Sequence, residues 1–395
     1  MRPGGEEDTV SDRTSRGPLA DITVVEFAGL TPVSVAGMLM SGLGADVIRV
    51  DRRDHEADSS ANTLRRGRRS VSLDLKHPDG ARVGRRLAGA ADVLLEGYRP
   101  GVMERLGLGP ENLLQDNPRL IYGRLTGWGQ QGPCAQMAGH DITYLALTGA
   151  LHLIGPADAP PVLPLNYVAD IGAGTMFLLM GILAALHERG GSGRGQVVDA
   201  AMVDAVPTLA ATVLRERARG EWRDERGANG LDGGAPFYRA YTCRDGRYIA
   251  VGAFDSGFFA QFVKGLGFDQ ASLPPQWDRS SWPAVSARFE TRIRERTRAE
   301  WEAEFTGTDA CVAPVLTLAE APLHPHMMAR QAFCEIDGHW QPGPAPKLGR
   351  TSMQVPEAVP APGADTRRVL GGLGLSDAET EELLDSGAAY QSPAQ

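Results

Sequence analysis

Cysteine and long apolar runs are both scarce in this sequence, and each shortage narrows the class of protein. The 395 residues include four cysteines, and no two of them form a CxxC pair or a Cys/His cluster with the spacing of metal ligands. We therefore expect reduced, structural cysteines and a cytoplasmic protein. No apolar run reaches the roughly 18 residues that a membrane helix needs. The best candidate, residues 174–186, is typical of a buried helix.

A signal peptide and a positive net charge are also missing. The N-terminus is polar and has no apolar core, so we expect a disordered leader over residues 1–17. The net charge of −9 argues against a general nucleic-acid binder. Basic residues nevertheless gather in one segment, which suits either a small anionic ligand or a solvated arginine-rich surface. They are Arg49, Arg52, Arg53, Arg65, Arg66, Arg68 and Arg69.

Strand and helix patterns alternate over the first part of the chain. Residues 21–27 are rich in β-forming side chains. Residues 33–43 follow with an apolar helical pattern, and residues 46–50 again favour a strand. This spacing predicts a βαβ unit and a parallel α/β sheet. Further elements are predicted as strands over 70–73, 91–95 and 120–124, and as a helix over 78–90.

The fingerprint of a nicotinamide dinucleotide site is absent from this βαβ unit. The turn after Phe27 contains no GxGxxG, and the Gly42-Leu43-Gly44 triplet precedes a strand instead of opening a helix. Asp51 stands where a ribose-binding acid would, but two arginines follow it. We therefore exclude a nicotinamide site.

The second half of the chain changes character. A glycine-rich segment, residues 227–236, is predicted to cross between two domains, and a β-hairpin pattern follows around Asp245-Gly246. We predict a large domain over residues 18–226, a small domain with its linkers over 227–325, and a return to the large domain with C-terminal helices over 326–395.

Four side chains are candidates for chemistry. His140 and Asp141 end a glycine-rich loop where the backbone could approach a ligand, although a helix cap is the alternative. We expect no metal there, because no partner histidines occur at helical spacing nearby. Asp170 precedes a glycine-rich helix start, where free N–H groups could bind an oxyanion, or it is a plain N-cap. Asp255 follows a strand and suits either a site or a turn.

Successive blocks of the sequence are similar to a known family. They include GADVIRVDR, DVLLEGYRPGVMERLGLGP, AGHDITYLALTGAL, PLNYVADIGAGTM, GLDGGAPFYRAY and DGRYIAVGAF. Together these blocks resemble the α-methylacyl-CoA racemases of the class III CoA-transferase (CaiB/BaiF) superfamily, over nearly the whole chain from about residue 18. The GHDI block, followed about thirty residues later by Asn166 and Asp170, distinguishes the racemases from the transferases.

The resemblance implies a fold and a set of site residues. The fold is a large domain with a Rossmann-like parallel sheet plus a smaller α+β domain, in an interlocked homodimer. His140 and Asp170 would be acid/base groups on opposite sides of the substrate's α-carbon. Asp255 would lie near the histidine, and Asp141 would help to hold the loop. Positions that match coenzyme A contacts are Arg52, Leu73, Lys76, Gly97, Tyr98, Arg99 and Arg105, and Tyr238 matches a position that lines the acyl pocket.

The implied activity is the interconversion of (2R)- and (2S)-2-methylacyl-CoA thioesters. Removing the weakly acidic proton at C2 and returning one to the opposite face needs two bases, but no metal and no redox step. A histidine and an aspartate whose pKa values are tuned by their surroundings suit this task. We therefore expect no cofactor, with coenzyme A as part of the substrate, and neither nucleic acid nor a membrane as a partner.

The sequence departs from the family at one site position and leaves two other functions open. The family carries glutamate followed by Pro-Gln where this chain has Asp255, Ser256 and Gly257.

Two other functions are therefore open beside that of a racemase. A CoA-transferase would use Asp170 as a nucleophile that forms an acyl anhydride. A non-catalytic CoA-binding homologue is the other alternative, which the altered Asp255 segment motivates. His140 separates the first of these from a racemase, because acyl transfer needs no base that faces Asp170.

Overall fold

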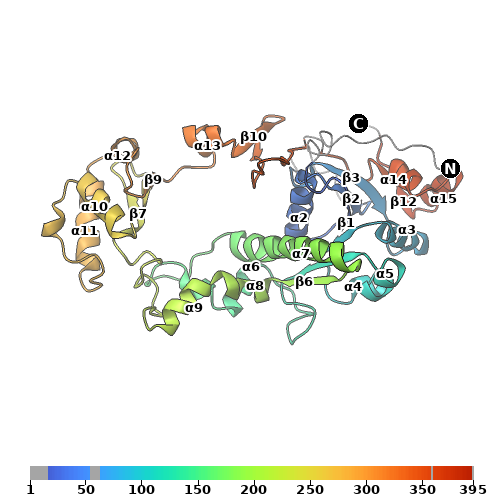
Figure 1. The fold of residues 1–395 in the computed structure, drawn as a ribbon, viewed down its shortest axis with the longest axis horizontal. Helices are drawn as coiled ribbons and strands as arrows, with labels where there is room; N and C mark the ends of the chain where they lie inside the picture. The colour runs from blue at the N-terminus through green and yellow to red at the C-terminus, as the bar shows by residue number, and fades with distance from the viewer. Residues whose placement is uncertain (1–16, 54–62, 357–358, 394–395) are drawn as a thin grey trace. The chain divides into compact units, whose positions relative to one another are not determined.

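The computed structural model describes residues 17–53, 63–356 and 359–393 (Figure 1). Except for Gly17, the predicted leader lies outside these ranges. Two compact units are formed. The first contains the described residues up to Tyr144, Asn166–Val206 and those from His324 onward, and the second contains Leu145–Leu165 and Pro207–Leu323. The domain limits predicted at residues 226 and 325 stay predictions.

The first unit is built around a seven-stranded sheet in the order β12-β3-β2-β1-β4-β5-β6. Every neighbouring pair is parallel except β12 with β3. The predicted parallel α/β fold is confirmed. The first and last residues of each strand whose range was predicted lie within two residues of the expected ones. The strands are β1 (Thr23–Phe27), β2 (Asp46–Asp51), β3 (Arg68–Leu73), β4 (Val93–Glu96), β5 (Ile121–Thr126), β6 (Val197–Ala201) and β12 (Ala389–Tyr390).

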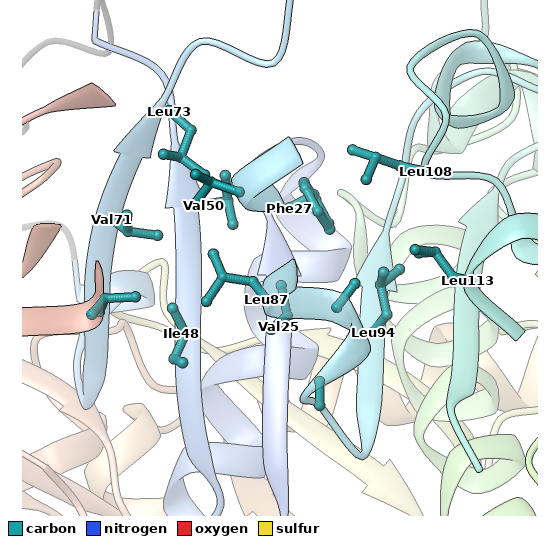
Figure 2. Packing of buried hydrophobic residues seen from close by; sticks show 14 of the residues in the cluster. Val25, Phe27, Ile48, Val50, Val71, Leu73, Leu87, Leu94, Leu108 and Leu113 are labelled. Carbon is teal, nitrogen blue, oxygen red and sulfur yellow. The ribbon is translucent and has the colours of Figure 1, made fainter. Parts of the chain in front are cut away.

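One face of the sheet forms the main apolar core of this unit. Side chains alternate between the two faces of a strand, so in β1 the residues Val25 and Phe27 point to this core and Glu26 points away. Figure 2 shows them packed with apolar side chains of β2, β3 and β4 and with Leu87. Helices that contribute to this core include α3 (Pro78–Gly89), α5 (Pro110–Asp116), α14 (Thr366–Gly372) and α15 (Asp377–Asp385).

The opposite face of the sheet is covered by α2 (Thr31–Gly42) and α7 (Met176–Ser192). The chain passes between the two units within α6 (Asp141–Leu147) and again within α8 (Met202–Leu209). The other elements of the first unit are η1 (Thr63–Arg65), α4 (Val102–Arg105), η3 (Tyr167–Thr175), α13 (Pro325–Arg330) and a hairpin of β10 (Phe333–Ile336) and β11 (His339–Pro342).

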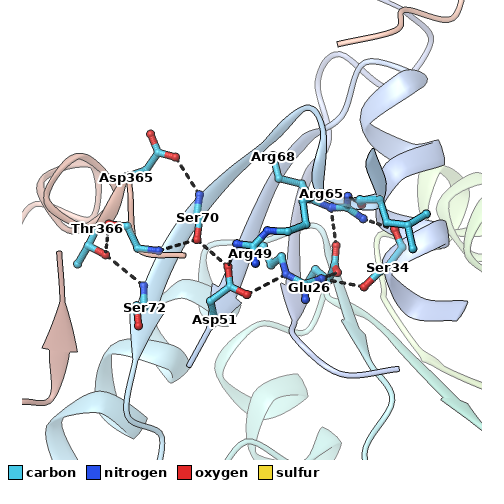
Figure 3. Close-up of polar contacts among 12 residues, drawn as sticks. Glu26, Ser34, Arg49, Asp51, Arg65, Arg68, Ser70, Ser72, Asp365 and Thr366 are labelled. Atoms are coloured by element: carbon cyan, nitrogen blue, oxygen red, sulfur yellow. Dashed lines mark hydrogen bonds and ion pairs between the residues drawn. The ribbon is translucent and has the colours of Figure 1, made fainter. Parts of the chain in front are cut away.

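A buried ionic network lies on the α2 side of the sheet (Figure 3). Arg49 forms ion pairs with Glu26 and, at 2.9 Å, with Asp51. Arg68 donates to Glu26 at 2.8 Å, and Arg65 donates to Asp51 at 2.8 Å. Both carboxylate side chains are inaccessible to solvent. The network therefore joins the three strands β1, β2 and β3 through charged side chains instead of apolar ones.

This network corrects part of the interpretation of the arginine-rich segment. Of the seven arginines, the three in the network are committed to internal carboxylates, and Arg66 is buried against Gln341 at 2.5 Å. Arg69 pairs with Asp46 at the edge of β2. Arg52 and Arg53 remain exposed after the end of β2. These two are therefore the members of the cluster that can meet a ligand.

The second unit combines a small antiparallel sheet with helices around an aromatic core. Its strands are arranged in the order β7-β8-β9. The core includes Phe237, Phe262, Phe289 and Trp301. The elements are η2 (Leu151–Leu153), α9 (Ala211–Ala218), β7 (Tyr238–Thr242), β8 (Tyr248–Gly252), α10 (Ser256–Gly265), η4 (Gln270–Ser272), α11 (Trp282–Ile293), α12 (Arg298–Phe305), β9 (Val312–Pro314) and η5 (Ala321–Leu323).

One helix in the described residues, Tyr167–Ser192, is long and apolar enough by length and composition to cross a membrane. This helix consists of η3 and α7 together, and it is longer than the buried helix predicted over residues 174–186. Of its most apolar stretch, 39% is buried, so the expectation of a buried helix holds only in part. Core helices of soluble proteins meet the same criterion, and the predicted absence of a membrane span stays a prediction.

Replacing Glu26 with glutamine should destabilise the protein by about 3–5 kcal/mol, because Arg68 would stay buried without its carboxylate partner and Arg49 would keep only Asp51. Urea unfolding followed by circular dichroism measures the change. Asp46→Asn is the matched control: it removes a surface partner of Arg69 and should cost about 1 kcal/mol or less. Equal effects of the two variants would contradict a structural role for the buried network.

Candidate active site

The strand order places several of the predicted site residues at one edge of the sheet. In a doubly wound sheet, ligands bind beyond the carboxyl ends of the strands where the strand order reverses, which here lies between β1 and β4. The segments that leave these strands and β5 begin at Ala28, Gly97 and Gly127. The last of these leads to His140.

The segment Gly97–Arg99 is held against the start of α2 and the end of β1. A Cβ atom at Gly97 would come within 2.8 Å of the Val33 side chain, so this close approach requires glycine. The Tyr98 hydroxyl donates to the carbonyl oxygen of Ala28 at 2.7 Å. Burial raises the pKa of Tyr98, and Arg52 beside its hydroxyl opposes that shift. The structure thus brings Arg52, directly after β2, close to Tyr98, which follows β4.

A buried charge pair beneath this segment was not found from the sequence. Glu96 accepts the backbone N–H of Tyr98 at 2.8 Å and is fully buried. Arg124 donates to Glu96 and to Glu104, at 3.0 Å in each case. Burial raises the pKa of Glu96 to about 7, while Arg124 acts to lower it. The signal in the sequence was an acid at the end of an apolar strand, directly before Gly97.

The predicted coenzyme A contacts differ in how far their side chains are exposed to solvent. Four of them are exposed cations, and within the described ranges none of the four forms an ion pair. They are Arg52, Lys76, Arg99 and Arg105. Leu73, in contrast, is 2% exposed, packs in the main core and pairs through its backbone with Ala389. Any contact that Leu73 makes with a ligand would have to come from its main chain.

The glycines of the loop before His140 serve close packing. A Cβ atom at Gly127 would lie 1.9 Å from the ring of Tyr144, and one at Gly139 would lie 2.5 Å from it. Trp128 packs edge-on against the same ring, with the centroids 4.8 Å apart. The sequence suggested glycines that let the backbone approach a ligand, whereas Gly127 and Gly139 let both ends of this loop pack closely against Tyr144 in α6.

His140 stands directly before α6, and its side chain is exposed. Its backbone N–H donates to the Thr143 hydroxyl at 3.0 Å, and that hydroxyl donates to the His140 carbonyl oxygen at 2.8 Å. Thr143 therefore fixes the backbone from which the imidazole projects. In the described part of the chain, no group of three or more His, Cys, Asp or Glu side chains could hold a metal.

Asp141 connects this loop to the segment that carries Asp170. One carboxylate oxygen, Oδ2, accepts the backbone N–H of Ala169 at 2.8 Å and that of Asp170 at 2.9 Å. Asp141 is 6% exposed, and within the described residues its other oxygen is buried without a hydrogen-bond partner. A single buried carboxylate thus joins the loop to two backbone amides that lie 28 and 29 residues further along the chain.

Asp170 lies inside the first turn of a helix, not before it. The π-helix η3 starts at Tyr167 and continues into α7. The sequence predicted free N–H groups next to Asp170, and this expectation is wrong for its nearest amides. The N–H groups of Ala169 and Asp170 donate to Asp141, and that of Ile171 donates to the Asn166 carbonyl oxygen at 3.3 Å.

The surroundings of Asp170 shift its acidity. Burial raises the pKa of Asp170, and the nearby charge of Asp141 raises it further. A hydrogen bond from Asn166 and the charge of His140 act in the opposite direction. The structure therefore brings His140, Asp141 and Asp170 into one polar cluster, in which the aspartate at position 170 is easier to protonate than an exposed one.

The predicted residues Asp255 and Tyr238 belong to the second unit. Asp255 is the N-cap residue of α10, but its exposed side chain makes no capping hydrogen bond. Tyr238 lines a cavity of 620 Å³ together with Phe254 and Trp277, whose rings pack edge-on against each other. The roles of these two residues beside His140 and the acyl chain stay predictions.

Comparison with known proteins agrees with this fold and set of segments. The model of CoA-transferase family III matches residues 19–366, which is most of the chain. The chain belongs to CoA-transferase family III.

Within this family, the similarity to racemases is pronounced. The α-methylacyl-CoA racemase of Mus musculus is 47% identical over 92% of this chain and 96% of its own length. That of Homo sapiens is 44% identical over the same shares of the two chains. A solved CaiB/BaiF family protein from Brucella suis superposes with a TM-score of 0.78 at 26% identity, over 91% of this chain and 100% of that one. The resemblance inferred from the sequence blocks is confirmed.

Two substitutions should move the pKa of Asp170 in opposite directions. Asp141→Asn keeps an oxygen for the two amides but removes the negative charge, so the pKa should fall. Asn166→Ala removes a hydrogen bond to the carboxylate, so the pKa should rise. NMR titration of ¹³C-carboxyl-labelled aspartate, assigned with Asp170→Asn, measures both shifts. Shifts of the same sign would contradict this arrangement.

Proposed function

We propose that the chain is an α-methylacyl-CoA racemase, which interconverts the (2R) and (2S) forms of a 2-methylacyl-CoA thioester. The 47% identity to the mouse racemase supports the proposal. The observation that carries it is the bond from the Asp170 amide to Asp141, because Asp141 directly follows His140 and so keeps the two candidate bases near each other. An acyl transfer through an Asp170 anhydride would have no use for a base at this position.

The proposed reaction moves one proton off C2 and another onto its opposite face. In one direction neutral His140 removes the proton, the electron pair of the C–H bond moves into the enolate, and protonated Asp170 donates to the other face. The reverse direction uses the Asp170 carboxylate as base and the His140 imidazolium as acid. Each turnover therefore leaves the pair in the opposite protonation state, and exchange of protons with solvent restores it.

The acidity of Asp170 suits this cycle. A carboxyl group with an unshifted pKa would hardly ever be protonated at neutral pH. Burial and the charge of Asp141 raise the pKa of Asp170 and so increase the share of the acid form. The acid form is the one in which Asp170 donates a proton to C2 in the proposed reaction. Since the nearest helix amides are occupied, the enolate oxygen must be stabilised by other donors.

Coenzyme A is proposed to bind along the carboxyl edge of the sheet. The exposed cations Arg52, Lys76, Arg99 and Arg105 suit its 3′-phosphate and pyrophosphate, because they can form charge-assisted hydrogen bonds without first breaking an ion pair. The backbone of Leu73 and the Gly97–Tyr98 segment would contact its adenosine part.

The remaining parts of the proposal rest on the family resemblance. Asp255 would orient the imidazole of His140, and Tyr238 would line the acyl pocket. The enzyme would act as a cytoplasmic homodimer and would need no cofactor beyond the coenzyme A carried by its substrate.

The test is incubation of the protein with a (2R)-2-methylacyl-CoA in D₂O without an acceptor acid. We expect deuterium at C2 together with loss of optical purity, measured by mass spectrometry and chiral chromatography. A second incubation adds a carboxylate acceptor: if no deuterium enters C2 in the first and coenzyme A moves to the acceptor in the second, the protein is a transferase. Absence of both reactions, with coenzyme A bound, would identify a non-catalytic homologue.

Single-base variants should separate exchange from racemisation. His140→Gln and Asp170→Asn should each lower interconversion by about 10²-fold or more, because general acid–base catalysis contributes factors of this size. Each variant should still exchange the α-proton of the one enantiomer whose proton faces the remaining base. His187→Gln, an exposed histidine of α7, is the control. Wild-type interconversion in either site variant would exclude the two-base mechanism.

A further inference from the structure

A second cavity lies wholly within the second unit, and it shares the lining residue Arg279 with the cavity that Tyr238 lines. Its volume is 670 Å³, within the range of about 300–1,000 Å³ that is usual for small-molecule sites. Three arginines from separate segments line it: Arg223 in the stretch before β7, Arg239 in β7 and Arg279 before α11. Asp232 is the one carboxylate among the lining residues.

The wall of this cavity is assembled by specific contacts. Arg226 donates to the carbonyl oxygens of Pro156 at 3.0 Å and Ala159 at 2.7 Å, which joins the segment near residue 156 to the glycine-rich segment. A Cβ atom at Gly234 would lie 2.4 Å from the carbonyl oxygen of Gly227, so the glycine-rich segment folds back on itself and requires glycine there. The cavity is therefore a built feature of the fold.

The carboxylate of Asp232 is already used to close the glycine-rich segment. Its oxygens accept the backbone N–H groups of Ala228, Asn229 and Gly234 and the side-chain amide of Asn229, at 2.8–3.3 Å. Asn229, which is 1% exposed, bonds in turn to the backbone N–H and the carbonyl oxygen of Arg223 at 2.9 Å each. The segment thus holds the backbone of Arg223 in place and leaves its guanidinium uncommitted.

The arginines carry more positive charge than the cavity neutralises. Within the described residues, neither Arg223 nor Arg239 forms an ion pair, and the Nε atom of Arg239 is buried without a hydrogen-bond partner. The guanidinium of Arg239 lies over the ring of Tyr241, 5.3 Å from its centroid. Arg279 donates to a backbone carbonyl oxygen, that of Glu221, at 2.6 Å. A buried donor of a charged group without a partner is costly, which points to a missing acceptor.

We propose that this cavity binds the phosphate group of a small molecule. Guanidinium groups form paired, charge-assisted hydrogen bonds with phosphate oxygens, and three of them against one committed carboxylate suit a doubly charged anion. The volume leaves room for the organic part of a phosphate ester beside the anion. The site is distinct from the proposed coenzyme A contacts, all of which belong to the first unit.

The experiment is a calorimetric titration of the full-length protein with inorganic phosphate at constant ionic strength. We expect saturable binding that weakens by about tenfold or more in Arg239→Gln and in Arg223→Gln, since each substitution removes a charge-assisted contact. Arg223 is exposed, so its substitution leaves the fold intact. Arg294→Gln is the matched control, because Arg294 directly follows α11 and is exposed in an ion pair with Glu290.

Arg52→Gln distinguishes this site from the proposed coenzyme A site. Phosphate binding that persists in Arg52→Gln and is weakened in the two cavity variants supports the proposal, whether or not the protein is a racemase. Binding that is lost in Arg52→Gln and unchanged in Arg239→Gln and Arg223→Gln would overturn it, as would the absence of saturable binding to the wild-type protein.

Discussion

The organisation of the candidate active site depends on one buried carboxylate. Asp141 accepts two consecutive backbone N–H groups, those of Ala169 and Asp170, in the first turn of η3. The first N–H groups of a helix have no partner within the helix, and here a side chain from another segment supplies the acceptor. The same negative charge raises the pKa of Asp170. Asp141 thus positions the catalytic candidate and tunes its acidity through a single contact.

Buried charge also supports the edge of the sheet on which these segments stand. Arg49 with Glu26 lies on the α2 side, and Arg124 with Glu96 on the side of the main core. Such pairs add little to stability compared with apolar residues of the same size, because desolvation offsets their attraction. Their geometry has a different consequence. Glu96 holds the N–H of Tyr98, so the pair fixes the backbone of a proposed substrate-binding segment.

Much of the fold could be predicted from the sequence, because strands and helices of a parallel sheet leave a local apolar pattern. The fate of individual charged residues could not. Arg49 and Arg52 are three positions apart, yet the first is internal and the second exposed, since only Arg49 lies within β2 and faces α2. The sequence placed Asp170 before its helix, although it lies in the first turn, for a similar reason. The residue that accepts the first N–H groups of η3 is Asp141, 29 positions before Asp170, and no local pattern reveals this contact.

Asp255 stands at the start of α10, where an aspartate usually has a capping role. An aspartate at an N-cap usually accepts an N–H of the first turn, which is worth about 0.5–2 kcal/mol. Asp255 occupies the N-cap of α10 without making that bond. The carboxylate of Asp255 therefore contributes no capping bond to α10 in the described structure, and its predicted role beside His140 stays a prediction. In that predicted role, an aspartate reaches one methylene less far than the family's glutamate, so a bond from it to an imidazole would need a closer backbone or a bridging water.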